Sequence, residues 1–272
     1  MADNTKIEWC DATWSPITGC TRISEGCANC YAERMTARNM WGYDFTPGTF
    51  HPHRLDQPLR WKKPRRIFVS SMGDLFHGQI HDDGGCSLSM PSYAWDEILD
   101  VVDACPRHTF IMLTKRADVM DVVMDQTREA ASCVGQLEVI PNVWLGVTAE
   151  NQKRADERVP ILLQIPAAQR FVSVEPMLGP VKWLNIPPHM PSWVICGAET
   201  GPGKRHMDLD WARDLRDQCI AAHVPFFFKK DSDGNSALDG REWKQFPALR
   251  AKGVEPGRGD NTRPQCAAEG AG

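Results

Sequence analysis

Six short runs of predominantly apolar residues recur along the chain beyond residue 60. Each run is nearly continuous rather than alternating, and Val, Ile and Phe are frequent in it. Continuous apolar runs of this length are typical of parallel strands that are buried on both faces. We therefore expect parallel strands at 66–70, 108–114, 142–148, 170–176, 192–198 and 224–229.

Between several of these runs the apolar positions recur with the period of a helix. In 92–105 and in 208–222 the apolar side chains fall on one helical face, and Asp208 and Asp210 are candidate caps for the second helix. Strands that alternate with helices form βα units. The expected fold class is therefore α/β, in the form of a partial or open (β/α) barrel of parallel strands. One further strand is expected near the first cysteines, and a doubly wound sheet remains the alternative.

Gly, Pro and Ser mark the segments that are expected to lack regular structure. The intervals 77–92 and 183–192 are rich in these residues and are predicted to be loops. Residues 251–272 lack apolar periodicity and are predicted to form a flexible tail. No repeat or linker divides the preceding part, so we expect residues 1–250 to form one domain.

Composition and charge narrow the class of protein. Apolar residues make up 42% of the 272 positions, which excludes global disorder. The formal net charge of −4 does not by itself indicate a nucleic-acid partner, although a local basic surface can still bind phosphate. The run "RWKKPRR" at 60–66 is the candidate for such a surface, with Trp61 available for stacking on a base. A solvated basic loop before a strand is the alternative interpretation.

The cysteines indicate the compartment. The chain has ten of them, but its start "MADNTKIEW" has no apolar segment of a signal peptide, and no run of about 18 apolar residues offers a membrane span. We therefore expect the cytosol, where clustered thiols are more often metal ligands than disulfides. Most of the other cysteines lie in apolar surroundings and are expected to be buried thiols.

Three cysteines stand apart in "TGCTRISEGCANCYAER", which covers 18–34. Cys27 and Cys30 form a Cys-x2-Cys pair, and Cys20 precedes that pair by six intervening residues. A structural zinc site would need a fourth ligand, for which His51 or His53 is the candidate. A redox dithiol would use the pair alone. A [4Fe–4S] cluster held by three thiolates would leave one iron open to an external ligand.

Several long stretches carry a resemblance to a known family. They are similar to a phage and prophage family of radical-SAM-like proteins that is known by its three-cysteine motif, and together they cover most of 6–230. The matching stretches are "IEWCDATWSPITGCTRISEGCANCYAER", "HPHRLDQPLRWKKPRRIFVSSMGDLFH", "TFIMLTKR", "NVWLGVTAENQKRADERVPILLQIPAAQRFVSVEPMLGP", "WVICGAETGPGKRHMDLDWARDLRDQC" and "VPFFFKK". Two departures from most radical SAM enzymes are the longer first gap and Asn29 in place of an aromatic residue before the last cysteine.

This resemblance implies a fold of the radical SAM type and two cofactors. Cys20, Cys27 and Cys30 would hold the [4Fe–4S] cluster, and S-adenosylmethionine would occupy its open iron. The turn after the first long strand, with Gly73 and Asp74, would bind the amino group of the methionine part. Capping of a helix by Asp74 is the alternative.

Two more carboxylates follow strands of the predicted sheet. Glu175 and Glu199 each stand where a strand ends, and the ends of strands face the ligand site in βα folds. They are expected to bind ribose hydroxyls or amines of the bound molecules. Exposed carboxylates at turns are the alternative.

The resemblance also implies a substrate and a setting. A protein like this would isomerise a glycine-modified thymidine in phage DNA, so that glycine attached through nitrogen becomes attached through its α-carbon. DNA would be the partner, together with an electron donor, and the host cytoplasm would be the location. The alternatives are a radical SAM repair lyase that acts on damaged DNA and a zinc-stabilised DNA-binding module without catalysis.

Overall fold

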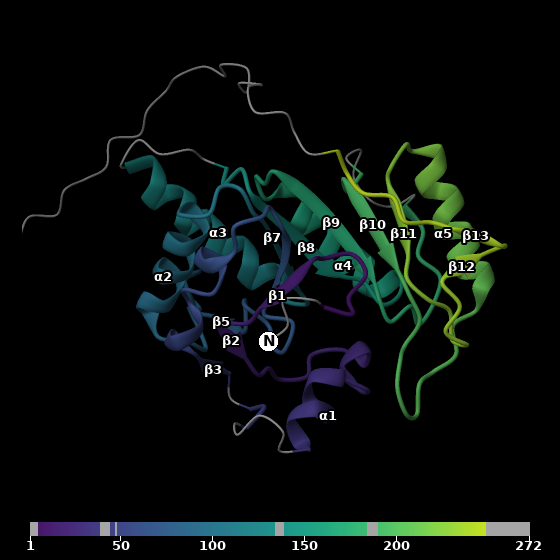
Figure 1. Ribbon diagram of the computed structural model, residues 1–272, viewed down its shortest axis with the longest axis horizontal. Coiled ribbons are helices and arrows are strands. Elements are labelled where there is room, and N and C mark those ends of the chain that lie inside the picture. Colours follow the sequence, from purple (N-terminus) through teal and green to yellow (C-terminus); the bar gives the residue numbers. More distant parts are fainter. Residues whose placement is uncertain (1–4, 39–43, 47, 134–138, 184–189, 249–272) are drawn as a thin grey trace, which may run out of the picture.

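The computed structural model describes residues 5–38, 44–46, 48–133, 139–183 and 190–248. Its centre is a sheet of seven parallel strands that curls into a half-barrel (Figure 1). In spatial order the strands are β1 (Ala12–Trp14), β4 (Arg66–Val69), β7 (Thr109–Thr114), β8 (Val143–Thr148), β9 (Gln169–Val174), β10 (Trp193–Cys196) and β11 (Phe226–Phe228).

The spatial order of these strands is the same as their order in the sequence. In a doubly wound sheet the strand order reverses in the middle of the sheet, so that alternative is wrong. The α/β class, the six predicted strands and the further strand near the cysteines are confirmed. The curled half-barrel is compatible with the predicted partial (β/α) barrel.

Most of the α-helices lie in connections between strands and cover the outer side of the sheet, whereas the first lies apart from them (Figure 1). Both predicted helices are present, and the Asp208 carboxylate caps the second by accepting from the Asp210 amide at 2.9 Å. The α-helices are α1 (Tyr31–Ala37), α2 (Ser92–Asp103), α3 (Ala117–Cys133), α4 (Gln152–Gln164) and α5 (Leu209–Ala221), and the 3-10 helices are η1 (Glu25–Cys27), η2 (Pro52–Arg54) and η3 (Pro58–Arg60).

Three two-stranded sheets lie outside the half-barrel. They pair β2 (Ile17–Thr18) with β3 (Thr49–Phe50), β5 (Gly78–Ile80) with β6 (Cys86–Leu88), and β12 (Ala237–Leu238) with β13 (Arg241–Glu242). The β5–β6 hairpin corrects the prediction of an irregular loop over 77–92. Gly84 and Gly85, which contributed to the loop prediction, lie in the hairpin's turn, where Gly84 has a φ of +84°.

The other sequence predictions of irregular segments fall mostly on positions that the structure leaves undescribed. In the predicted loop 183–192, residues 184–189 lie outside the described residues, and 190–192 form no helix or strand. The tail 251–272 also lies outside them, so the tail and the domain boundary at 250 stay predictions. No helix within the described ranges is long and apolar enough to cross a membrane.

The two faces of the sheet have different cores. The outer face packs against the helices in the larger apolar cluster. On the inner face, a second cluster of mainly aromatic side chains surrounds Trp193, whose ring lies 5.7 Å from Phe171, 6.0 Å from Trp144 and 6.1 Å from Phe227. A half-barrel therefore does not leave an open channel here, because aromatic rings fill its inner face.

Candidate functional site: a pocket lined by three cysteines

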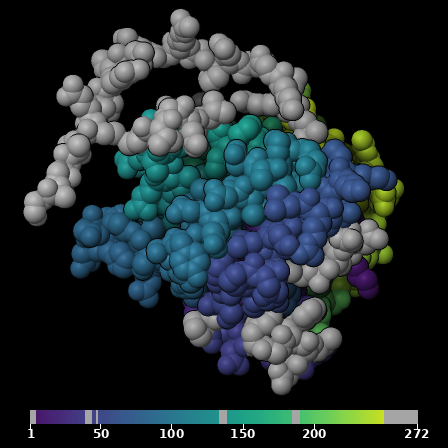
Figure 2. Space-filling model, turned by 60° about the vertical axis from the view of Figure 1, so that its left-hand side comes forward, coloured from purple at the N-terminus to yellow at the C-terminus, as the bar shows by residue number. Residues whose placement is uncertain are grey.

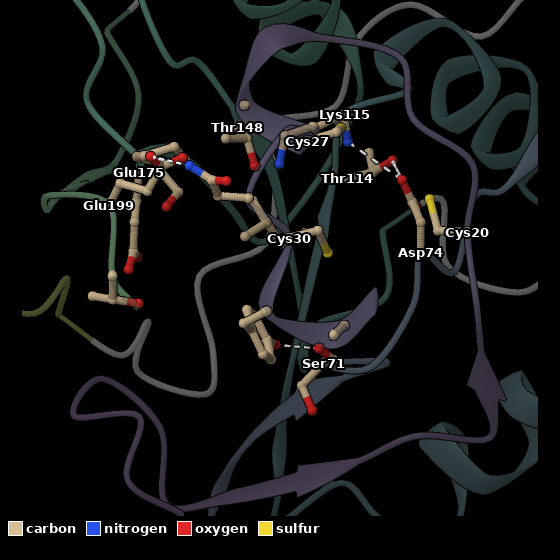
Figure 3. A pocket seen from close by; sticks show the side chains of 18 of the residues that line it. Cys20, Cys27, Cys30, Ser71, Asp74, Thr114, Lys115, Thr148, Glu175 and Glu199 are labelled. Atoms are coloured by element: carbon tan, nitrogen blue, oxygen red, sulfur yellow. Dashed lines mark hydrogen bonds between the residues drawn. The ribbon is translucent and has the colours of Figure 1, made fainter. Parts of the chain in front are cut away.

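A pocket lies at the carboxyl edge of the sheet, directly above the aromatic cluster. Its cavity measures about 380 Å³ and is lined by residues that follow β4, β7, β9, β10 and β11 and by Thr148 at the end of β8. All seven site residues expected from the sequence line it, as Figure 3 shows for most of them. They are Cys20, Cys27, Cys30, Gly73, Asp74, Glu175 and Glu199. We call this site the cysteine pocket.

The strand sequences explain why this pocket is polar above an apolar floor. Side chains two residues apart point to the same face of a strand. On the inner face, β9 and the residue after it present Phe171, then Ser173, then Glu175, and β11 is followed on that face by Lys229. The inner faces of β9 and β11 thus change from aromatic to polar toward the carboxyl ends of the strands, which places titratable groups around the pocket.

The loop that carries the cysteines is joined to the sheet through its backbone at Gly19. Gly19 donates to the Met72 carbonyl at 2.9 Å and forms a bridge with Gly73. A Cβ at position 73 would lie 2.7 Å from the Gly19 carbonyl oxygen. The close approach that Gly73 permits is therefore to the cysteine loop itself, and its predicted contact to S-adenosylmethionine stays a prediction.

A buried ion pair holds the middle of the same loop. Glu150 follows β8 and pairs with Arg158 of α4 at 2.8 Å, with both side chains almost fully buried. Ser24 donates to this carboxylate, and a Cβ at position 26 would overlap it. Gly26 and Ser24 therefore pack directly on the Glu150–Arg158 pair, which fixes the backbone just before Cys27.

Two further arginines hold the loop near its last cysteine. Arg154 donates to the Glu25 carboxylate at 2.8 and 3.1 Å, and Arg205 donates to the Glu25 carbonyl at 2.9 Å. Asn29, next to Cys30, donates to Glu199 at 2.8 Å. The sequence analysis missed these groups as loop supports. Glu150 follows a strand and could have been found by the rule that selected Glu175, but its arginine partner carries no local signal.

Asp74 has a full set of internal partners. It accepts from the Thr114 hydroxyl at 2.8 and 2.9 Å, from the Phe76 amide at 3.0 Å and from Arg116 at 3.1 Å. No helix follows it, so the alternative of a helix cap is wrong. A carboxylate has about four acceptor sites. A contact from Asp74 to an ammonium group would therefore require the Arg116 pair to open.

Glu175 and Glu199 lie on the side of the pocket opposite Asp74 (Figure 3). They differ in how accessible their carboxylates are to a bound molecule. Burial alone would raise the pKa of Glu199, but hydrogen bonds from Arg205 and Asn29 outweigh it and lower the pKa to about 2. Glu199 is thus a fixed structural anion. Glu175 is paired with Lys229, and both side chains are partly exposed, at 23% and 22%. Their carboxylate and ammonium groups are the ones that a bound molecule can reach.

A comparison with protein families places the chain. The family described as a protein of unknown function, DUF5131, matches residues 4–247, which is most of the chain. The chain belongs to the DUF5131 family. The DUF5131 match includes every residue that lines the cysteine pocket. No match was found among curated proteins or among solved structures.

The three thiols in this DUF5131 pocket are potential metal ligands, but their arrangement does not suit a single ion. Among the described residues, no three potential ligands lie close enough together to hold one metal ion. A cubane cluster holds its ligand sulfurs farther apart than a single ion does, and three thiols around one cavity are suited to it. Burial, with a contribution from Asp74, raises the pKa of Cys20 to about 11, so this thiol is protonated until a metal displaces its proton.

The histidines expected as a fourth zinc ligand do not reach the pocket. No histidine belongs to its described lining. His51 is buried under β2, where its ring nitrogen lies 2.7 Å from the Thr18 hydroxyl, and burial lowers its pKa to about 4. The structure therefore does not bring His51 or His53 to the three thiols.

The basic run 60–66 lies before β4, at the opposite edge of the sheet from the pocket. Trp61 is buried, with the Arg65 guanidinium 4.9 Å from its ring, so the interpretation of Trp61 as a stacking platform is wrong. Lys62 and Lys63 are exposed. In Figure 2 the blue segments, which include this part of the chain, form much of the visible face.

Proposed function

We propose that this protein is a radical SAM enzyme, in which Cys20, Cys27 and Cys30 hold a [4Fe–4S] cluster. The observation that supports it is the convergence of three thiols from one firmly held loop with acidic and basic strand-end groups, above an aromatic floor, at the carboxyl edge of a half-barrel. When bound, the cluster and S-adenosylmethionine supply an electron and a carbon radical that abstracts hydrogen.

The residues of the chain would then bind, orient and exclude water. Glu175 and Lys229 present opposite charges that match the amino and carboxylate groups of the methionine part. Thr148 and Ser173 offer hydroxyls beside them. The aromatic floor excludes water from below, which strengthens each of these contacts. Of the four residues predicted to bind S-adenosylmethionine, Glu175 is thus the one best placed for direct contact.

We propose further that the substrate is thymidine of phage DNA carrying glycine on its methyl carbon, as the family resemblance of the sequence implies. In the isomerisation, the bond between the methyl carbon and the glycine nitrogen breaks and a bond to the glycine α-carbon forms. The α-hydrogen of glycine is a suitable target because amine and carboxylate stabilise the resulting radical. The enzyme would act in the host cytoplasm with an external electron donor.

Anaerobic reconstitution with ferrous iron and sulfide tests the class of protein. We expect wild type to bind about four iron and four sulfide per chain, and the variants Cys20→Ala, Cys27→Ala and Cys30→Ala each to lose the cluster. Cys105→Ala is the matched control, because Cys105 is fully buried in the outer core and should leave iron binding unchanged.

Two outcomes would contradict the proposal. A full cluster in the Cys20→Ala variant would remove the proposed ligand set, and a colourless protein that binds zinc would favour a structural metal site. With the cluster in place, the loaded wild type should convert S-adenosylmethionine to 5′-deoxyadenosine. Mass spectrometry of nucleosides from glycine-modified DNA then tests the substrate separately from the class.

A further inference from the structure

The guanidinium of Arg116 joins the first cysteine to the sheet. Arg116 follows β7 directly, and its side chain is 7% exposed. Its Nη1 donates to Cys20 Sγ at 3.2 Å and to Asp74 Oδ2 at 3.1 Å. Its Nη2 donates to the Thr21 carbonyl at 3.0 Å and hydroxyl at 2.9 Å. One side chain thus contacts the sulfur, the residue after it and a buried carboxylate.

The surroundings keep this arrangement in place. Asp74, which holds the guanidinium, is itself fixed by Thr114 and by the Phe76 amide. The backbone before Cys20 is fixed by the contact of Gly19 with Gly73. The guanidinium therefore cannot move away without breaking its other hydrogen bonds, and the backbone that carries Cys20 is held beside it.

A neutral thiol would accept only a weak hydrogen bond from this guanidinium. Thiol sulfur is a weak acceptor, whereas a sulfur bound to iron carries negative charge and accepts strongly. The contact is also specific to one cysteine. In the described part of the chain, the Cys27 sulfur shares a hydrogen bond with the uncharged Ser24 hydroxyl at 3.8 Å, and either atom can be the donor. The charged donor is placed at Cys20 alone among the three thiols, within the residues described.

We propose that Arg116 is a positioning residue for the iron–sulfur cluster, which rests on the function proposed above. Its guanidinium orients Cys20 as a ligand and donates an N–H to the ligand sulfur. Reduction adds negative charge to the cluster, and a fixed positive donor at the sulfur favours that state. Arg116 therefore raises the reduction potential of the cluster, and Asp74 acts through Arg116 by fixing its orientation.

The test is a spectroscopic redox titration of the reconstituted protein, with iron content measured in parallel. In Arg116→Met we expect the reduced form to be disfavoured about tenfold, which is about 59 mV for a one-electron couple. Arg116→Lys keeps the charge and should recover most of that shift. It should lose iron faster to a chelator than wild type, because a lysine lacks the second donor for Thr21.

Arg154→Met is the matched control. Arg154 also holds the cysteine loop, but among the described residues it donates to Glu25 and Glu157 rather than to a sulfur. Its loss should weaken the loop without moving the potential. A potential in Arg116→Met equal to that in Arg154→Met would overturn the inference while leaving the proposed function intact.

Two further outcomes can be distinguished from equal potentials in the two variants. If wild type binds no cluster, the proposed function fails and this inference fails with it. If Arg116→Met does not fold because Asp74 is left as an unpaired buried charge, Arg116→Met/Asp74→Asn removes both charges. The double variant should show a smaller shift in the same direction, because the N–H donor to the sulfur is lost while the opposing charge of Asp74 is removed as well, and a wild-type potential in it would overturn the inference.

Discussion

Replacing Glu150 by Gln removes one charge of a buried ion pair and changes the shape of the side chain very little. Glu150 is fully buried and Arg158 is 6% exposed, so the variant leaves a guanidinium in a low-dielectric site without its counter-charge. Removing one partner of such a pair costs about 3–5 kcal/mol. For a chain of this size that corresponds to a fall in Tm of about 6–20 °C.

The assay is calorimetry together with urea unfolding of wild type and of two variants. Glu157→Gln is the matched control, because it is the same substitution in a nearby ion pair whose carboxylate is 42% exposed. Exposed pairs of that kind contribute about 0.2–1 kcal/mol. Near-equal losses in the two variants would refute the reasoning that burial decides the cost. Adding Arg158→Met to Glu150→Gln should restore part of the stability, since it removes the unpaired charge.

Two other substitutions test the cysteine pocket and the aromatic cluster beneath it. The pKa of Glu199 is about 2 in the folded protein, so its stabilising effect is present above pH 4.5 and is lost as pH falls toward 2. The loss of unfolding free energy between pH 6 and pH 3 should therefore be smaller in Glu199→Gln than in wild type, and parallel curves would contradict this. Gly146→Ala would place a methyl group against the Phe171 ring, and urea unfolding should show a loss of about 1–3 kcal/mol. An unchanged midpoint would show that the aromatic cluster can adjust.

The strands could be predicted from the sequence because burial on both faces leaves a clear pattern. All six residues of β8 are buried, and the strand predicted at 142–148 differs from β8 only at its first residue. The β5–β6 hairpin was missed because its strands have three residues each and are partly exposed, so no apolar run marks them. The order of strands in the sheet is likewise absent from periodicity, since a strand's own pattern does not identify its neighbours.

The candidate site was likewise only partly predictable from the sequence. Residues that follow strands could be placed at one edge of the sheet from the sequence, as Glu175 and Glu199 were. Their partners could not be predicted. That Asp74 is bound to Arg116 and Glu199 to Arg205 depends on side-chain geometry across the pocket. Gly73 was predicted from the sequence to lie in a binding turn, and its close contact with the Gly19 backbone could not be predicted.

The side chains that hold the cysteine loop come from much later in the chain than the loop does. Ser24 bonds to a partner 126 residues away, Asn29 to one 170 residues away and Glu25 to one 180 residues away. A ribosome that makes about 5–20 residues per second exposes the three thiols many seconds before these partners exist. The nascent chain therefore carries the three cysteines before Glu199 and Arg205, which hold their loop, have been synthesised. If the chain holds the proposed cluster, its insertion would therefore wait for the synthesis of residue 205, and a chain truncated before that residue would lack this support of the cysteine loop.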